Sequence, residues 1–304
     1  MDRILITGAL GQLGSEFIKY FKKTNSFVLA TDIRNPEKKL SCQFENANAL
    51  DKEVINSLIK KYDINIIYHL VAILSASGEK NPFFSWKLNI DSFQNIVEIS
   101  VKNKIKKIFW PSSIAVFGTE SKLELVSQNP LMNPSTIYGI SKLAGEKLLE
   151  YYFNKFGLDI RSLRYPGIIS IETKPGGGTT DYIIEMLNAA KKGEDYCCFL
   201  NENTELPMMY IDDAIESAIK LMSVSRKNLS ISSSYNITGF SITPKQLLNE
   251  IINNGFKIKV DYKADFRQKI ADSWPKKIDD SLATKDWAWK PKFGLRESIK
   301  ETLK

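Results

Sequence analysis

The chain has 304 residues, of which 43% are hydrophobic and 25% charged, which is the profile of a folded globular protein with room for one large domain or two modest ones. Its net charge of +7 comes from lysines and arginines scattered over helix ends and exposed faces, which argues against nucleic acid as a partner. The longest apolar runs are too short to cross a bilayer, and no secretion-type signal or Cys/His metal spacing is present. We therefore expect a cytoplasmic protein without metal or membrane partner.

Strands and helices alternate through the first half of the chain. Apolar and β-branched runs predict strands over 3–9, 26–32, 64–72, 105–113 and 158–169. Apolar residues at three- and four-residue spacings predict helices over 11–24, 51–62, 92–104 and 135–155. Alternation of this kind predicts an α/β fold of the Rossmann type, with a doubly wound parallel sheet covered on both faces.

The pattern is looser after about residue 170. A glycine-rich loop over 173–181 is followed by predicted helices over 210–222 and 243–255 and strands over 234–238 and 256–264. No repeat or linker separates this region from the first. We predict a main domain made of residues 1–170 and 208–240, and a smaller interleaved C-terminal lobe made of 171–207 and 241–304.

Three glycines mark the first strand-to-helix turn. Gly8, Gly11 and Gly14 stand in "ITGALGQLG", where glycine allows the backbone to approach a pyrophosphate at the helix N-terminus. Asp32 ends the next strand and can accept hydrogen bonds from ribose hydroxyls, which favours NAD over NADP. Arg34 leaves the strictness of that preference open, because an arginine there can hold a 2′-phosphate. The main domain is thus predicted to bind NAD.

Tyr138 and Lys142 lie one helical turn apart in "YGISK", so their side chains share a face. A free phenol has a pKa near 10, so forming phenolate at pH 7 costs roughly 4 kcal/mol. A neighbouring ammonium favours the charged phenolate and lowers that cost, which suits Tyr138 to remove a proton from a substrate hydroxyl. Ser112 and Ser113, at the end of the fourth strand, are both candidates for the hydroxyl that polarises the reacting oxygen.

These features together resemble the extended short-chain dehydrogenase/reductase superfamily. The resemblance implies Tyr138 as acid/base, Lys142 as the residue that holds the nicotinamide ribose, and Ser113 as the active hydroxyl, because the family pattern S-x-x-V-[YF]-G begins at that serine. Dehydratases of the superfamily carry Asp-Glu after the hydroxyl, where this chain has Ile114 and Ala115. Nucleotide-sugar epimerases carry R-Y-[FT]-N where this chain reads "RYPG".

Seven segments narrow the resemblance to the short-chain L-threonine 3-dehydrogenase family; they are "HLVAILSASGEKNP", "FWPSSIAVFG", "PSTIYGISKLAGE", "LRYPGIIS", "PGGGTTDYIIEM", "LPMMYIDDAI" and "SWPKKIDDSLATKDWAWKP". The implied reaction is oxidation of L-threonine by NAD⁺ to L-2-amino-3-oxobutyrate. The resemblance implies that the substrate is bound by Ser75, Ser113, Tyr138, Thr179, Thr180 and Asp181. It implies that NAD is bound by Gly8, Gly11, Gln12, Leu13, Gly14, Asp32, Ile33, Arg34, Asn48, Ala49, Leu70, Ala72, Asn89, Lys142 and Tyr165.

Two other functions stay open at this point. One is a nucleotide-sugar 4-epimerase of the same superfamily, and the other is an NAD-sensing protein without catalysis. Extended family members commonly form homodimers through two helices per subunit, which predicts a dimer through 92–104 and 135–155. The glycine run Gly176–Gly178 predicts that the segment before it is mobile without ligand and that the 173–181 loop closes over bound amino acid. His69, the single histidine, is interpreted as a packed residue at a strand end.

Overall fold

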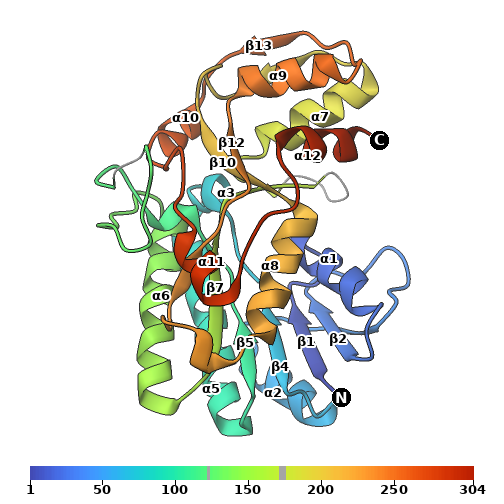
Figure 1. Cartoon of the computed structure of the whole chain (residues 1–304). Coiled ribbons are helices and arrows are strands. Elements are labelled where there is room, and N and C mark those ends of the chain that lie inside the picture. The colour runs from blue at the N-terminus through green and yellow to red at the C-terminus, as the bar shows by residue number, and fades with distance from the viewer. Residues whose placement is uncertain (122–123, 171–175) are drawn as a thin grey trace.

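The computed structural model describes residues 1–121, 124–170 and 176–304. A parallel sheet with helices on both faces fills one part of the molecule, and a smaller group of helices and short strands lies beyond one end of it (Figure 1). The predicted α/β fold with a doubly wound parallel sheet is therefore confirmed. The residue boundaries of the two predicted units stay a prediction.

Within the described residues, eight strands form the main sheet, and all of their pairings are parallel. Their order in space is β11 (Ser234–Asn236), β7 (Ile160–Tyr165), β5 (Lys107–Phe109), β4 (Ile66–His69), β1 (Arg3–Thr7), β2 (Phe27–Asp32) and β3 (Gln43–Asn46), with β6 (Ser112–Ser113) beside β7. The strand order reverses between β1 and β4. In open α/β sheets the crevice at such a switch point, beyond the carboxyl ends of the strands, is where ligands bind.

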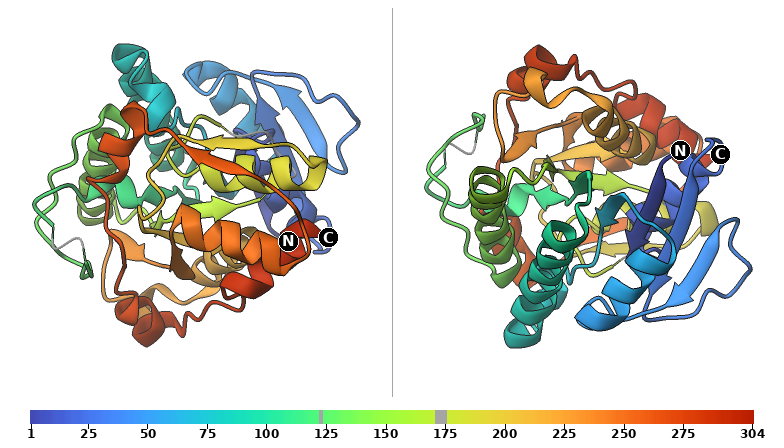
Figure 2. Two further views of the ribbon diagram at one scale, coloured as in Figure 1. Left: turned by 90° about the horizontal axis from the view of Figure 1, so that it is seen from above. Right: turned by 90° about the horizontal axis from the view of Figure 1, so that it is seen from below.

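Helices cover both faces of this sheet, as the views from above and below show (Figure 2). In β1, Ile4 and Ile6 point into one hydrophobic cluster and Leu5 into another, which is the alternation of a strand buried on both faces. One face is covered by α1 (Gln12–Phe21), α8 (Ile211–Ser223) and α11 (Ser281–Trp287), and the other by α2 (Lys52–Lys61), α5 (Ser92–Asn103) and α6 (Ile137–Phe156).

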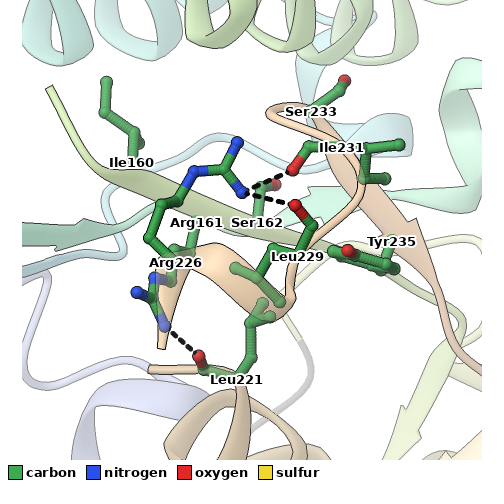
Figure 3. Close-up of a pocket in the computed structure, with 9 residues that line it drawn as sticks. All are labelled: Ile160, Arg161, Ser162, Leu221, Arg226, Leu229, Ile231, Ser233 and Tyr235. Carbon is green, nitrogen blue, oxygen red and sulfur yellow. Dashed lines mark hydrogen bonds between the residues drawn. The ribbon is translucent and has the colours of Figure 1, made fainter. Parts of the chain in front are cut away.

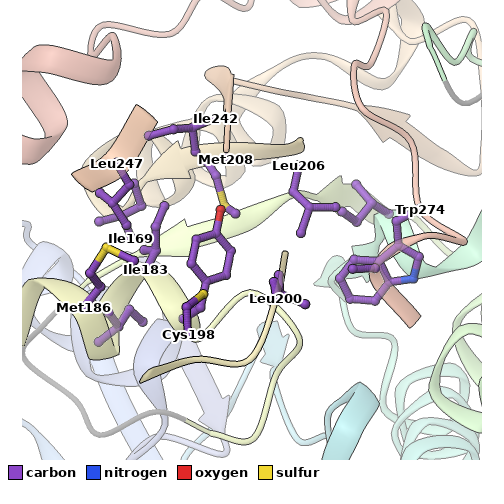
Figure 4. Close-up of a cluster of buried hydrophobic side chains, with 14 of the residues drawn as sticks. Ile169, Ile183, Met186, Cys198, Leu200, Leu206, Met208, Ile242, Leu247 and Trp274 are labelled. Carbon is purple, nitrogen blue, oxygen red and sulfur yellow. The ribbon is translucent and has the colours of Figure 1, made fainter. Parts of the chain in front are cut away.

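The smaller group of elements has its own apolar core, in which Met186, Leu206, Met208 and Leu247 pack together (Figure 4). Its strands are β8 (Gly167–Ile169), β10 (Leu206–Tyr210) and β12 (Phe240–Ile242) in one sheet, and β9 (Tyr196–Cys198) with β13 (Val260–Tyr262) in another. Its helices are α7 (Tyr182–Lys192), α9 (Pro244–Asn253), α10 (Phe266–Ala271) and α12 (Leu295–Leu303).

The remaining helical elements in the described part of the chain are short. They are α3 (Ser75–Gly78), α4 (Pro82–Trp86), the π-helix η1 (Lys87–Asp91) and the 3₁₀ helices η2 (Ile114–Val116) and η3 (Arg226–Asn228). The π-helix η1 leads directly into α5, so the chain turns from the end of β4 through α3 and α4 before it crosses back along the sheet. None of the helices in the described part of the chain is long and apolar enough to span a membrane.

Two of the predicted strands are wrong as single elements, because each breaks at a proline. The predicted strand 105–113 is β5 and β6 on either side of Pro111, and the predicted strand 158–169 is β7 and β8 on either side of Pro166. Proline has no N–H to donate to a ladder, so a strand interior does not continue through it. The second break matters for the architecture, since β7 belongs to the main sheet and β8 pairs with β10 in the smaller one.

Candidate active site

The glycine turn after β1 fits an anionic pyrophosphate. Gly8 has a φ of +68°, and Gly11 stands at the N-cap of α1, whose first amides have neither a side-chain cap nor an acidic neighbour in the first turn. A Cβ on Gly14 would lie 2.5 Å from the Gly8 carbonyl oxygen, so only glycine lets the turn fold against the helix this closely. Uncapped amides at a helix N-terminus are a ready anion site.

Asp32 is tied to that turn. Its carboxylate accepts the Leu10 amide at 3.1 Å, and the side chain is only 7% exposed. Its other oxygen accepts the Arg34 amide at 3.1 Å and the Arg34 Nε at 3.2 Å. The guanidinium of Arg34 therefore folds back toward the carboxylate, although its side chain is 64% exposed. The geometry joins the ribose-binding candidate to the phosphate-binding turn.

The other cofactor candidates lie along the same carboxyl edge. Gln12 donates to the Ile168 carbonyl oxygen at 3.4 Å and so reaches from α1 to β8. The side-chain oxygen of Asn89 accepts a hydrogen bond from the Ile73 amide at 2.8 Å. The remaining candidates occupy the ends of β2, β3, β4 and β7 and the start of α1; they are Leu13, Ile33, Asn48, Ala49, Leu70, Ala72 and Tyr165. Their contact with a cofactor stays a prediction.

Tyr138 lies in the first turn of α6, which begins where the Thr136 hydroxyl accepts the Gly139 amide at 3.1 Å. The phenol is 8% exposed, and burial raises its pKa to about 12, while a hydrogen bond with Ser113 acts in the opposite direction. The tyrosine is thus a neutral phenol near pH 7.

Lys142 is buried one turn further along α6. Its Nζ donates to the Pro111 carbonyl oxygen at 2.6 Å and lies 5.6 Å from the centroid of the Tyr138 ring. Burial lowers the pKa of Lys142 to about 7, and the negative charge of Glu146 opposes that effect. The pair predicted from the spacing is therefore brought together, with the ammonium held by the carbonyl exposed at the break between β5 and β6.

A buried ion pair lies behind Lys142, and it was not predicted from the sequence. Glu146 accepts Arg164 Nε at 2.9 Å and Nη2 at 2.8 Å, and also accepts the Ser112 hydroxyl at 2.6 Å. Ser112 is therefore engaged with Glu146, whereas Ser113 faces Tyr138. This difference supports Ser113 as the active hydroxyl and gives Ser112 a structural task.

The substrate candidates gather where the described part of the glycine-rich loop rests on α3. The Ser75 and Thr179 hydroxyls are 3.1 Å apart, and the Gly177 carbonyl oxygen accepts the Ser77 amide at 3.1 Å. Asp181 accepts the amides of Gly177 and Gly178, each at 2.8 Å, and burial raises its pKa. Residues 171–175, where mobility was expected, lie outside the described residues.

Thr180, the remaining substrate candidate, packs onto Gly167. A Cβ at Gly167 would lie 2.8 Å from the Thr180 Cγ2 and 2.2 Å from the Met208 sulfur. Position 167 is the one at which epimerases of the superfamily carry an asparagine. Here the space such a side chain would need is filled by the threonine and the methionine, which reduces the room available for a large substrate.

His69 lies at the end of β4, in the same region as these residues. The imidazole is fully buried between the Thr7 hydroxyl at 2.7 Å and the Ser92 hydroxyl at 3.1 Å. Burial lowers its pKa to about 3, so it is neutral near pH 7 and acts as a packed polar residue at the end of β4. In the described ranges no group of three or more His, Cys, Asp or Glu side chains is arranged to hold a metal.

A small hollow lies beside the first residues of β7, away from the candidate active site (Figure 3). Its arginines are committed to backbone carbonyls. Arg161 donates to the Leu221 oxygen at 2.5 Å, and Arg226 donates to the Ile231 oxygen at 2.9 Å. Their role is to hold the segment after α8 against the sheet.

Comparison with known proteins agrees with this geometry. Residues 4–238 match the NAD dependent epimerase/dehydratase family. An uncharacterized epimerase/dehydratase of Staphylococcus haemolyticus is 40% identical over 311 residues, covering 100% of this chain and 97% of its own. A GalE-like L-threonine dehydrogenase of Cupriavidus necator, solved in its holo form, is 42% identical with a TM-score of 0.96, covering 99% of this chain and 98% of its own. A monomeric L-threonine 3-dehydrogenase from a metagenome is 42% identical with a TM-score of 0.95, covering 99% and 97%.

Proposed function

This chain belongs to the NAD dependent epimerase/dehydratase family, and we propose that it oxidises the side-chain hydroxyl of L-threonine to give L-2-amino-3-oxobutyrate, with NAD⁺ as the acceptor. The observation that carries the proposal is the pairing of Tyr138 with the buried Lys142 on one face of α6, where the lysine Nζ lies 5.6 Å from the centroid of the phenol ring. A base, a hydroxyl and an ammonium at the carboxyl edge of the sheet suit the removal of a proton from a secondary alcohol. Similarity to solved L-threonine dehydrogenases supports threonine as that alcohol.

Tyr138 is the proposed base. The bound nicotinamide supplies the hydride acceptor, and the chain supplies the proton acceptor. Ser113 orients the substrate oxygen toward the phenol, and Lys142 favours the phenolate through its positive charge. The Thr136 cap starts α6 two residues before the tyrosine and fixes the helix backbone that carries Tyr138 and Lys142.

Asp181 is the proposed partner of the substrate ammonium. Burial disfavours its negative charge and raises its pKa, and the amides of Gly177 and Gly178 offset this effect in part. An ammonium group in reach of the carboxylate would compensate the charge fully. Ser75, Thr179 and Thr180 offer hydroxyls to the substrate carboxylate. We propose that residues 176–181 close over the amino acid and exclude water from the reaction.

The proposed cofactor preference is NAD over NADP. Asp32 is buried and tied to the glycine turn, and Arg34 bonds to that carboxylate. The 2′-phosphate of NADP would lie close to the negative charge of Asp32. We expect repulsion by this carboxylate to outweigh the attraction of the more exposed Arg34.

The test is a direct assay. The protein mixed with NAD⁺ and L-threonine should form NADH, and it should not interconvert UDP-glucose and UDP-galactose. In Tyr138→Phe the turnover number should fall by on the order of 10²–10⁴ while NADH affinity is kept, because only the acid/base group is lost. Tyr20→Phe, at an exposed tyrosine of α1, is the matched control. Epimerisation without NADH formation from threonine, or full activity of Tyr138→Phe, would contradict the proposal.

Asp32→Ser tests the cofactor assignment. The wild type should use NAD⁺ far better than NADP⁺, and removing the carboxylate should narrow the ratio of the two kcat/KM values by weakening NAD⁺ and relieving the repulsion of NADP⁺. Arg34→Ala is the companion variant and should leave the preference for NAD⁺ in place. Equal use of both cofactors by the wild type would show that Arg34 controls this pocket.

Asp181→Ala tests the amino-acid site. Losing the carboxylate should raise the KM for threonine strongly and leave NADH affinity almost unchanged, because Asp181 lies on the loop against α3 and not at the glycine turn. Asp195→Ala, an exposed aspartate after α7, serves as the control. Unchanged KM and kcat for threonine in Asp181→Ala would show that another residue binds the substrate ammonium.

We also propose a homodimer through α5 and α6, the helices within 92–104 and 135–155. Exposed apolar side chains on these two helices would be covered by a second copy; they are Val101, Ile140, Tyr151 and Phe156. Sedimentation velocity should give a mass near twice that of the chain. A monomer over a wide concentration range would exclude the dimer, and a similar solved structure is described as monomeric.

A further inference from the structure

Trp110 is clamped between two helices directly beneath the catalytic edge. It follows β5, and its side chain is 1% exposed. On one side its ring centroid lies 4.9 Å from that of Phe93 on α5. On the other side it lies against Gly145 on α6, where a Cβ would stand 2.3 Å from the Trp110 Cη2. The glycine is therefore needed for the indole to occupy this position.

The same indole faces the ammonium of Lys142. The Nζ lies 4.3 Å from the ring centroid, within the range in which a cation is attracted to the face of a tryptophan. The Pro111 carbonyl oxygen is the hydrogen-bond acceptor of that ammonium, at 2.6 Å. Trp110 and Pro111 are consecutive in the chain, so a single short segment supplies both contacts.

The ionisable groups around Lys142 do little to stabilise its ammonium form. Glu146 lies one turn along α6, but Arg164 on β7 pairs with it at 2.8 Å and offsets its charge. Tyr138, also on α6, is a neutral phenol, and His69 on β4 is a neutral imidazole near pH 7. A buried cation in such surroundings depends strongly on the neutral groups that touch it.

We propose that Trp110 is a positioning residue, whose indole face keeps the Lys142 ammonium protonated and in place beside Tyr138. The inference deepens the proposed function and rests on it, because it assumes that Lys142 serves the cofactor and the base. Gly145 acts one step further out, because its lack of a side chain leaves room for the indole, whereas Phe93 adds apolar packing against the ring. In the sequence, this contact corresponds to the tryptophan of "FWPSS" and the glycine of "KLAGE".

The experiment follows the pH dependence of NADH affinity, measured by fluorescence titration without substrate. A dinucleotide with two negative phosphates favours a protonated lysine, so wild-type affinity should fall as pH rises through the Lys142 titration. In Trp110→Leu the midpoint of that fall should move down by about one pH unit, because the neutral lysine is then favoured. Trp110→Phe keeps an aromatic face and should stay near the wild-type midpoint.

Phe93→Leu is the matched control, since it removes an aromatic ring from the same clamp without removing a contact of Lys142. Its melting temperature should fall and its midpoint should stay where it is. Gly145→Ala pushes the indole away from α6 and should lower the midpoint as Trp110→Leu does, which keeps the test open if the leucine variant does not fold. Lys142→Met should abolish the transition.

The outcomes separate the inference from the function it rests on. A lowered melting temperature with an unmoved midpoint in both Trp110→Leu and Gly145→Ala would overturn the inference and make Trp110 a core residue only. A transition that persists in Lys142→Met would also overturn it. A shifted midpoint in a protein that forms no NADH from L-threonine would support the role of Trp110 toward the cofactor and reject threonine as the substrate.

Discussion

Arg164 and Glu146 form an ion pair in which the side chains are 2% and 1% exposed. Such a pair is stable only when every remaining donor and acceptor is also bonded, and removing one partner typically costs about 3–5 kcal/mol. Here the arginine also reaches the Gln128 carbonyl oxygen at 2.6 Å and the Asn236 amide oxygen at 3.0 Å. The pair therefore joins α6 to β7, to β11 and to the segment after Val126. Lys142 is one turn before Glu146, so the position of α6 and of the proposed base depends on this buried contact.

The two proline breaks explain why the candidate groups meet where they do. At Pro111 the chain leaves β5, and the freed carbonyl oxygen accepts the lysine ammonium at 2.6 Å. At Pro166 the chain leaves β7 and enters the smaller sheet, where Gly167 supports Thr180. The first break thus supplies the acceptor for Lys142 beside the proposed base, and the second leads toward the loop that is proposed to bind the substrate. A continuous strand at either place would have used these backbone groups in a ladder and separated the two halves of the site.

Local pattern was sufficient for the parts of the site that lie within one element. The glycine turn, the carboxylate at the end of β2 and the Tyr138–Lys142 spacing are each readable within a few residues. Contacts between distant elements were not readable in this way. Trp110 against Gly145, Arg164 with Glu146 and Asp181 with the amides of its own loop depend on how strands and helices are packed. The strands around Pro111 and Pro166 were drawn too long because their apolar residues continue through the break.

Burial shifts the pKa values of three ionisable groups in the site, and each shift favours the neutral form. Burial raises the pKa of Tyr138 to about 12, lowers that of Lys142 to about 7 and raises that of Asp181, so each group is pushed toward its neutral form. In the proposed reaction each of these penalties has a complementary charge in the bound molecules. The ammonium of the amino acid matches Asp181, the net negative charge of the dinucleotide favours a protonated Lys142, and the positive nicotinamide ring favours the phenolate. Because a charge in low dielectric gains most from a partner that also excludes water, cofactor and amino acid are expected to strengthen one another's binding. Burial by itself disfavours the charged base, and proton abstraction becomes favourable only when both molecules are bound.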